Sequence, residues 1–198
     1  MSEQLELFDK AEGRVDVPLS KSSTWIAFFS QTGSEIANLA ESLGRWPDRI
    51  ITNDRPDHLR SIDPRIEKKG YFTMSNKPTL EEYEDLLVYF PESLITLHGW
   101  LRVVPPSICE KHGIYNGHPG LITEYPELKG KDPQIRAYEA KHDVMGCVLH
   151  KVTAGVDEGK IISEERFNAW RISKDDMFKA LKQRSEYLWV HFLRKAGV

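Results

Sequence analysis

The chain has 198 residues, of which 40% are hydrophobic and 29% charged, with a formal net charge of -3 at pH 7. This composition is typical of one globular domain, and no apolar run reaches the ~20 residues that a membrane span needs. The sequence has no dense basic cluster for a nucleic-acid groove, and its acidic start, MSEQLELFDK, is not a secretory signal. We therefore expect a cytoplasmic monomer or homodimer with a small-molecule site and no nucleic-acid or membrane partner.

Two parts are predicted along the chain. Residues 1–22 show little periodicity and are expected to form an N-terminal arm or lead-in, whereas 23–198 are expected to form a single domain. The domain opens with the apolar run 24–30, which predicts a strand buried on both faces. A helical spacing of apolar residues follows, and Ser34 is placed to cap that helix.

Strand and helix patterns then alternate along the chain. Thr79 begins a helix with a Thr-Leu-Glu-Glu capping box, and Ser173 begins a long amphipathic helix that closes the chain. Short apolar runs bounded by turn residues predict further strands, and Pro-initiated patterns predict short helices. The further strands are expected at 49–53, 70–74, 93–99, 113–116, 145–152 and 160–167, and the short helices within 54–69, at 105–113 and at 132–141.

This alternation predicts an α/β fold with a doubly wound, mostly parallel sheet. The last two strands have no helix between them, which predicts a late antiparallel extension. In open sheets of this kind, ligands bind outside the carboxyl ends of the strands. The stretches QTGS, HGWLR and NGHPG each follow a predicted strand, so we expect them to converge on one site.

Cys109 and Cys147 are the only two cysteines, and neither lies in a spacing typical of a zinc ligand. We expect both to be buried small side chains, and we expect no metal site.

Asn116 and His118 are the first candidates for chemistry. Two residues apart in an extended segment, they project to one side and can address the same reacting atom. Taken alone, the pair favours a turn Asn and a partly exposed loop His, but its place at the end of a predicted central strand, followed by Pro119 and Gly120, favours a site. Asp157, in the loop VTAGVDEGKII, is the natural third member, although that loop by composition also fits a solvated hairpin turn.

The three side chains form a coherent chemical set. An amide and a protonated imidazole can donate to an oxyanion that develops on a carbonyl carbon. A carboxylate beside the imidazole favours its charged form and can take up a proton from an attacking amine. No serine or cysteine adjoins the set, which favours direct attack by a substrate nucleophile over a covalent acyl-enzyme.

The stretch NGHPGL (116–121), followed by VTAGVDEGKII, resembles the signature of the folate-dependent formyltransferases. That signature reads Asn-x-His-Pro-Ser-Leu-Leu-Pro, with a later Asp in Val-x-x-x-x-Asp-x-Gly-x-Ile. The resemblance runs from about residue 24 to the end and is closest to the glycinamide ribonucleotide enzymes. It implies a Rossmann-like formyltransferase fold, 10-formyltetrahydrofolate as co-substrate, and Asn116, His118 and Asp157 as catalytic residues.

The resemblance also implies binding residues. The segment HGWLRVV (98–104) is similar to the family segment that lines the folate pocket, and the Asp157 loop would close over the pterin. His150 is similar to a family histidine for which a structural role is expected. The implied folate contacts are Leu101, Arg102, Val104, Gly155, Val156 and Asp157, and the implied acceptor contacts are Gly33, Ser34 and Glu186.

Three departures from the family pattern affect the expected acceptor site and the loop that follows His118. Glu35 stands where the nucleotide enzymes have Asn, close to where a substrate phosphate would bind. Two like charges about 4 Å apart cost about 1 kcal/mol in water, so this carboxylate disfavours a phosphate. Gly120 replaces Ser in the His-Pro motif, and GKDPQIRAYEAKHD is unlike the corresponding family segment.

The leading functional hypothesis is transfer of a formyl group to the primary amine of a small soluble substrate, such as glycinamide ribonucleotide in purine biosynthesis or a related, phosphorylated amino-nucleotide. The chain leaves no room for the additional domains of larger relatives, which favours a small acceptor. Three alternatives remain. They are formyl transfer to an amino-sugar nucleotide, hydrolysis of the formyl-folate, and a module that binds folate or a nucleotide without turnover.

Overall fold

The computed structural model describes residues 24–54 and 61–198, so the predicted arm and residues 55–60, in the first part of the 54–69 loop, lie outside the described residues. Within those ranges the strands form one seven-stranded sheet in the order β3-β2-β1-β4-β5-β6-β7. The strands are β1 (Trp25–Phe29), β2 (Arg49–Asn53), β3 (Phe72–Met74), β4 (Leu94–His98), β5 (Gly113–His118), β6 (Val144–Lys151) and β7 (Ile161–Asn168).

The pairing confirms the predicted fold class. The first five strands run parallel to one another, and β6 and β7 continue the sheet in antiparallel pairs. The strand order reverses between β1 and β4, and at such a switch point a crevice opens outside the carboxyl ends of the strands. The predicted stretches QTGS and HGWLR both begin there.

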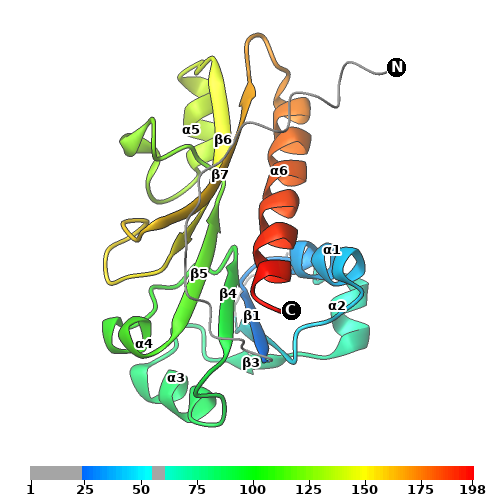
Figure 1. The fold of residues 1–198 in the computed structure, drawn as a ribbon, viewed down its shortest axis with the longest axis vertical. Helices are drawn as coiled ribbons and strands as arrows, with labels where there is room; N and C mark the ends of the chain where they lie inside the picture. The colour runs from blue at the N-terminus through cyan, green and yellow to red at the C-terminus, as the bar shows by residue number, and fades with distance from the viewer. Residues whose placement is uncertain (1–23, 55–60) are drawn as a thin grey trace.

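Helices cover both faces of the sheet. Figure 1 shows α1, α2 and α6 on one side and α3 and α4 on the other, with α5 beside the upper part of β6. The helices are α1 (Ser34–Leu43), α2 (Pro64–Lys69), α3 (Leu80–Leu87), α4 (Pro106–Lys111), α5 (Pro133–Glu139) and α6 (Lys174–Lys195), with a short 3₁₀ turn, η2 (Pro126–Leu128).

Two of the three helix caps that the sequence predicted are confirmed. Thr79 and Glu82 form the predicted capping box, and Ser173 caps α6 by accepting the amide hydrogen of Asp176. The prediction for α1 was wrong, because Ser34 is already helical and Gly33 is the N-cap. Gly33 has φ 72°, a left-handed conformation that a residue without Cβ adopts at little cost.

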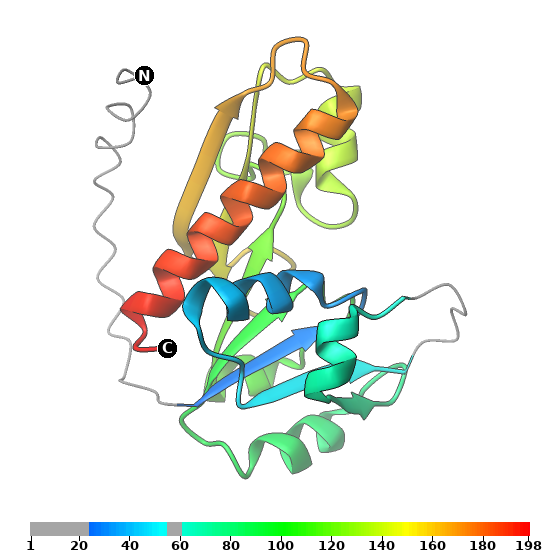
Figure 2. The same ribbon diagram turned by 90° about the vertical axis from the view of Figure 1, so that its right-hand side faces the viewer.

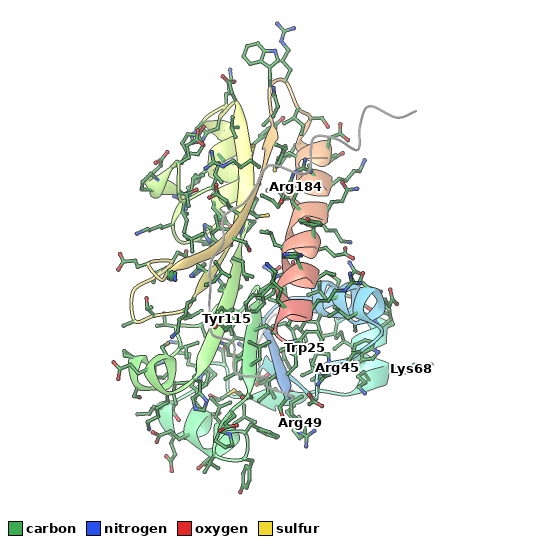
Figure 3. All side chains as sticks on the ribbon, in the orientation of Figure 1. Trp25, Arg45, Arg49, Lys68, Tyr115 and Arg184 are labelled. Atoms are coloured by element: carbon green, nitrogen blue, oxygen red, sulfur yellow. The ribbon has the colours of Figure 1, made fainter. Side chains whose placement is uncertain are left out.

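The two faces of the sheet carry separate hydrophobic clusters. Trp25 and Tyr115, labelled in Figure 3, belong to the cluster under α1 and α6, and Ile26 and Ile114 belong to the cluster on the other face. Strand residues alternate between faces, so each face receives every second side chain. The fully apolar strand β1 is buried on both faces, as predicted.

The C-terminal helix α6 is the longest in the described chain, at 22 residues. Figure 2 shows it running along β6 and β7 and meeting α1 in its second half. Its predicted stripe of Met177, Leu181, Leu188 and Phe192 is buried. No helix in residues 24–54 and 61–198 is both long and apolar enough to cross a membrane.

Both cysteines are buried and free, as the sequence predicts for small core side chains. Burial raises the pKa of Cys109, and it raises the pKa of Cys147 to about 12.

Trp189 of α6 packs directly against the backbone of β5. Its side chain is 1% exposed, and a Cβ built on Gly117 would lie 2.7 Å from the indole Nε1. The indole therefore occupies the space that a side chain at position 117 would need. Trp189 also contacts the ring of His98, with 4.6 Å between the ring centroids.

We expect Gly117→Ala to lower the free energy of unfolding by about 1–3 kcal/mol, because the new methyl group overpacks a buried indole. Urea denaturation followed by Trp fluorescence measures the change. Gly113→Ala, in the same strand, is the matched control, since its Cβ would meet Tyr115 at an ordinary 3.6 Å. Equal effects of the two substitutions would contradict the packing argument.

Candidate active site

The ends of β5 and β6 bring the first candidate residues together. Asn116 and His118 both lie within β5, so their side chains project from the same face of the sheet. The antiparallel register pairs Asn116 with His150 of β6. Asp157 comes from the loop between β6 and β7 and reaches both histidines.

His118 is held between a carboxylate and a carbonyl. Its Nδ1 lies 3.3 Å from Oδ2 of Asp157, and its Nε2 lies 3.0 Å from the backbone oxygen of Leu128. The side chain is only 5% exposed. Both ring nitrogens therefore face acceptors, an arrangement that a doubly protonated imidazolium satisfies best.

Burial lowers the pKa of His118 below its ordinary value, while the charge of Asp157 and the carbonyl of Leu128 partly offset this effect. The charges of His150 and Arg136 also disfavour the imidazolium. The sequence analysis expected a protonated His118. The structure shows that burial opposes this charge and that Asp157 and Leu128 support it.

Asp157 connects the two histidines. Its Oδ1 lies 3.3 Å from Nε2 of His150, and its Oδ2 accepts the amide hydrogen of Gly130 at 2.8 Å. Burial alone would raise the pKa of this carboxyl, but the contact with His150, the charge of His118 and the Gly130 hydrogen bond together hold it below its ordinary value. The carboxylate is thus ionised although its side chain is only 10% exposed.

His150 orients Asn116. Its Nδ1 lies 3.0 Å from the carbonyl oxygen of Lys151 and donates to it. Its Nε2, which faces Asp157, also lies 3.2 Å from Asn116 Nδ2. The amide nitrogen of Asn116 carries two hydrogens, so at least one of them remains for an oxygen of a substrate.

The predicted folate segment leaves β4 and turns across the sheet end. The Leu101 side chain is 47% exposed, whereas Val104 is 4% exposed and packs in the core. Arg102 donates to the backbone and side-chain oxygens of Asn76, at 2.5 and 2.6 Å. In the loop between β6 and β7, the Val156 side chain is 57% exposed, next to Gly155 and Asp157. Leu101 and Val156 thus offer apolar surface that a flat ring can bury.

The N-terminus of α1 carries a partly buried polar network. Glu35 accepts from Ser185 of α6 at 2.6 Å and lies 2.8 Å from His98 Nδ1. Burial would raise the pKa of Glu35, but His98 and Ser185 hold it below its ordinary value. The amide of Ser34 already donates to the Thr32 hydroxyl at 3.2 Å. This helix end therefore presents an ionised carboxylate.

Glu186 is not brought together with Gly33 and Ser34. Its Oε1 accepts from the hydroxyl of Ser42 at 2.8 Å, in the last turn of α1. At 1.5 Å per residue, Ser42 lies about 12 Å along the helix from Ser34. The two parts of the predicted acceptor set thus lie at opposite ends of α1.

The sequence did not predict the backbone contacts of the candidate catalytic residues. The Leu128 carbonyl and the Gly130 amide contact His118 and Asp157, and no residue type signals such a contact. It also missed His98, which pairs with Glu35. The available signal for His98 was its own position, as a polar residue at the end of the apolar run of β4.

A family model described as Formyl transferase matches residues 54–193. The chain belongs to the formyl transferase family. Among relatives, the formyltetrahydrofolate deformylase of Bacillus subtilis is 27% identical over 158 residues, which cover 77% of this chain and 47% of that protein. The phosphoribosylglycinamide formyltransferase of Mycobacterium tuberculosis is 25% identical over 160 residues, which cover 75% and 73%. The chain spans about half the length of the deformylases that it matches.

Solved structures share this fold. The phosphoribosylglycinamide formyltransferase of Bacillus halodurans superposes with a TM-score of 0.70 at 21% identity, over 87% of this chain and 94% of that one. The deformylase of Pseudomonas syringae superposes with a TM-score of 0.65 at 15% identity, over 83% and 58%. At these identities the likeness establishes the fold that formyl transferases share.

We expect Asp157→Asn to lower the pKa of His118 further, because the carboxylate charge that supports the imidazolium is removed. Asp157 has φ 51°, which Asn tolerates, so the loop is expected to keep its conformation. An NMR titration of the His118 ring measures the shift. Asp85→Asn, an exposed position on α3, is the control. An unchanged His118 pKa in Asp157→Asn would show that the two groups are not coupled.

Proposed function

We propose that the protein transfers a formyl group from 10-formyltetrahydrofolate to the primary amine of a small soluble substrate. The single observation that carries this proposal is the contact of Asp157 with His118 at the end of β5, beside the oriented amide of Asn116. Acyl transfer to an amine needs a hydrogen-bond donor to the oxyanion, an acid and a proton acceptor, and these three groups can supply them. Membership of the formyl transferase family supports the same reaction.

Each residue has a distinct role in this mechanism. The free hydrogen of the Asn116 amide donates to the formyl oxygen as negative charge develops on it. The His118 imidazolium stabilises the same charge, and the adjacent Asp157 carboxylate stabilises the imidazolium. Asp157 also accepts, directly or through water, the proton that the amine must lose. The bond between the formyl carbon and the folate nitrogen then breaks, and this nitrogen takes up the proton as tetrahydrofolate leaves. The co-substrate supplies the activated formyl group when bound, and the exposed side chains of Leu101 and Val156 are the proposed contacts for its pterin ring.

The acceptor is the finer part of the proposal. Glycinamide ribonucleotide is the first candidate, since phosphoribosylglycinamide formyltransferases are among the relatives, and it would place the protein in purine biosynthesis. Gly33 and Ser34 at the N-terminus of α1 are the proposed contacts for its phosphate. The ionised carboxylate of Glu35 beside them acts against a phosphate at this helix end.

Hydrolysis of the formyl-folate is the second candidate function. Two formyltetrahydrofolate deformylases are among the relatives, and water as the acceptor needs no phosphate site beside Glu35. The same three residues would activate a water molecule in place of an amine.

Formyl transfer from 10-formyltetrahydrofolate, followed by folate absorbance and by mass spectrometry of the products, tests the proposal. The acceptors are glycinamide ribonucleotide, other amino-nucleotides, amino-sugar nucleotides and water alone. A gain of one formyl group on an amine supports transfer and identifies the acceptor. Formate release without any amine acceptor supports hydrolysis. If no acceptor gives turnover, the remaining hypothesis is a module that binds folate or a nucleotide without turnover.

We expect Asn116→Ala and His118→Ala each to lower kcat by about 10²–10³, because the first removes a donor to the developing oxyanion and the second removes the positive charge beside it. Affinity for the folate, measured by fluorescence quenching, is expected to stay within about twofold, since these groups act mainly in the transition state. His191→Ala on the exposed face of α6 is the control. Near-full activity of either catalytic variant would refute its assignment.

We expect Glu35→Gln to lower the KM for glycinamide ribonucleotide by about tenfold, because the variant removes a negative charge worth about 1 kcal/mol or more near the phosphate. Gln can still bond to His98 and Ser185, so the network is retained. Glu41→Gln, in the last turn of α1 and paired with Arg65, controls for the general loss of charge. An unchanged KM would place the phosphate elsewhere.

A further inference from the structure

The backbone of residues 127–131 contacts both acid-base residues of the site. The carbonyl oxygen of Leu128 accepts the Nε2 hydrogen of His118 at 3.0 Å, and the amide of Gly130 donates to Asp157 at 2.8 Å. Only backbone atoms of this segment make these two contacts. The orientation of the His118 ring and of the Asp157 carboxylate therefore depends on where this stretch of backbone lies.

One side chain of α5 holds that backbone. The guanidinium of Arg136 donates to the carbonyls of Leu128 at 3.0 Å, Lys129 at 2.6 Å and Lys131 at 3.1 Å, and also to that of Glu127. A guanidinium presents five N–H donors in a rigid plane, so it can hold several carbonyls at once. The Leu128 oxygen thus receives hydrogen bonds from both His118 and Arg136.

Helix α5 packs closely against the loop that follows His118. This packing explains how Arg136 reaches the backbone of residues 127–131. A Cβ built on Gly120 would lie 2.7 Å from Cβ of Pro133, the first residue of α5, and 2.9 Å from Nε2 of His118. Gly120 thus leaves room for both α5 and the imidazole. This accounts for one departure noted in the sequence, the glycine that follows His-Pro.

From this geometry we infer that Arg136 is a positioning residue of the active site, which fixes residues 127–131 so that their backbone holds both His118 and Asp157. Arg136 acts through the Leu128 carbonyl and the Gly130 amide, and no contact with substrate is required. The kinetic consequence rests on the proposed formyl transfer, whereas the effect on the His118 ring does not. A displacement of catalytic groups by about 1 Å can cost about 10²-fold in rate.

A conservative substitution separates the geometry of Arg136 from its charge. The charged groups that face His118 are Asp157, His150 and Arg136. The positive charge of Arg136 disfavours the imidazolium, whereas the Leu128 carbonyl that it holds in place favours it. Arg136→Lys keeps the charge but loses the planar set of donors, so only the support from the carbonyl weakens. The pKa of His118 should then fall.

The experiment compares Arg136→Lys with Arg45→Lys in the full-length protein. Arg45 also forms an ion pair, with Asp48 at 3.1 Å, and Figure 3 shows it at the lower end of the molecule, whereas α5 lies at the upper end in the same view. NMR follows the His118 ring titration and the exchange of its Nε2 hydrogen with solvent. Formyl transfer gives kcat and KM, and a thermal scan shows that each variant is folded.

In Arg136→Lys we expect kcat to fall about tenfold to hundredfold, with an unchanged KM for the folate, a lower pKa of His118 and faster exchange of its Nε2 hydrogen. Arg45→Lys should match the wild type. If Arg136→Lys does not fold, Arg136→Gln, which keeps one donor toward the loop, is expected to show the same faster exchange.

An unchanged His118 titration and exchange rate in a folded Arg136 variant would overturn the inference, even if the melting temperature fell. If the wild type transfers no formyl group to any acceptor, the proposed function fails. The His118 signals would still decide whether Arg136 positions the ring.

Discussion

A buried negative charge, the carboxylate of Asp157, is the interaction on which the site depends. An ionised carboxylate that is 10% exposed is costly unless it is paired and hydrogen-bonded. Here two imidazoles and one backbone amide satisfy it, and each comes from a different part of the chain, namely β5, β6 and the segment before α5. The same carboxylate therefore supports the charge of His118 and ties three elements together.

The change from parallel to antiparallel pairing at β5 makes this arrangement possible. A parallel neighbour would place its own carboxyl end beside that of β5, and its following loop would leave in the same direction. The antiparallel β6 instead sets His150 opposite Asn116, and the loop after β6 returns Asp157 to the pair. The candidate catalytic groups thus occupy one face of the sheet, while His98, Glu35 and Trp189 occupy the face under α6.

The sequence predicted those features that follow from local patterns. Apolar runs and capping residues placed the strands and most helix starts, and the two-residue spacing of Asn116 and His118 placed their side chains on one face. Spacing could not bring Asp157 to His118, because that contact depends on how the β6–β7 loop returns. Nor could the sequence show that Glu186 and Ser34 lie apart, because the angle between α1 and α6 is set by tertiary packing. The four carbonyl contacts of Arg136 left no pattern in the sequence at all.

The packing of Trp189 on Gly117 has a consequence for how the protein can be dissected. The backbone that carries Asn116 and His118 lies directly on an indole from the last helix, and the same indole touches His98. Strand β5 and the C-terminal helix therefore pack as one unit, although about 70 residues separate Gly117 from Trp189 in the chain. A fragment that ends before α6 would keep Asn116, His118 and Asp157 and yet lose the surface against which β5 is aligned, so its activity would say little about the chemistry of the intact site.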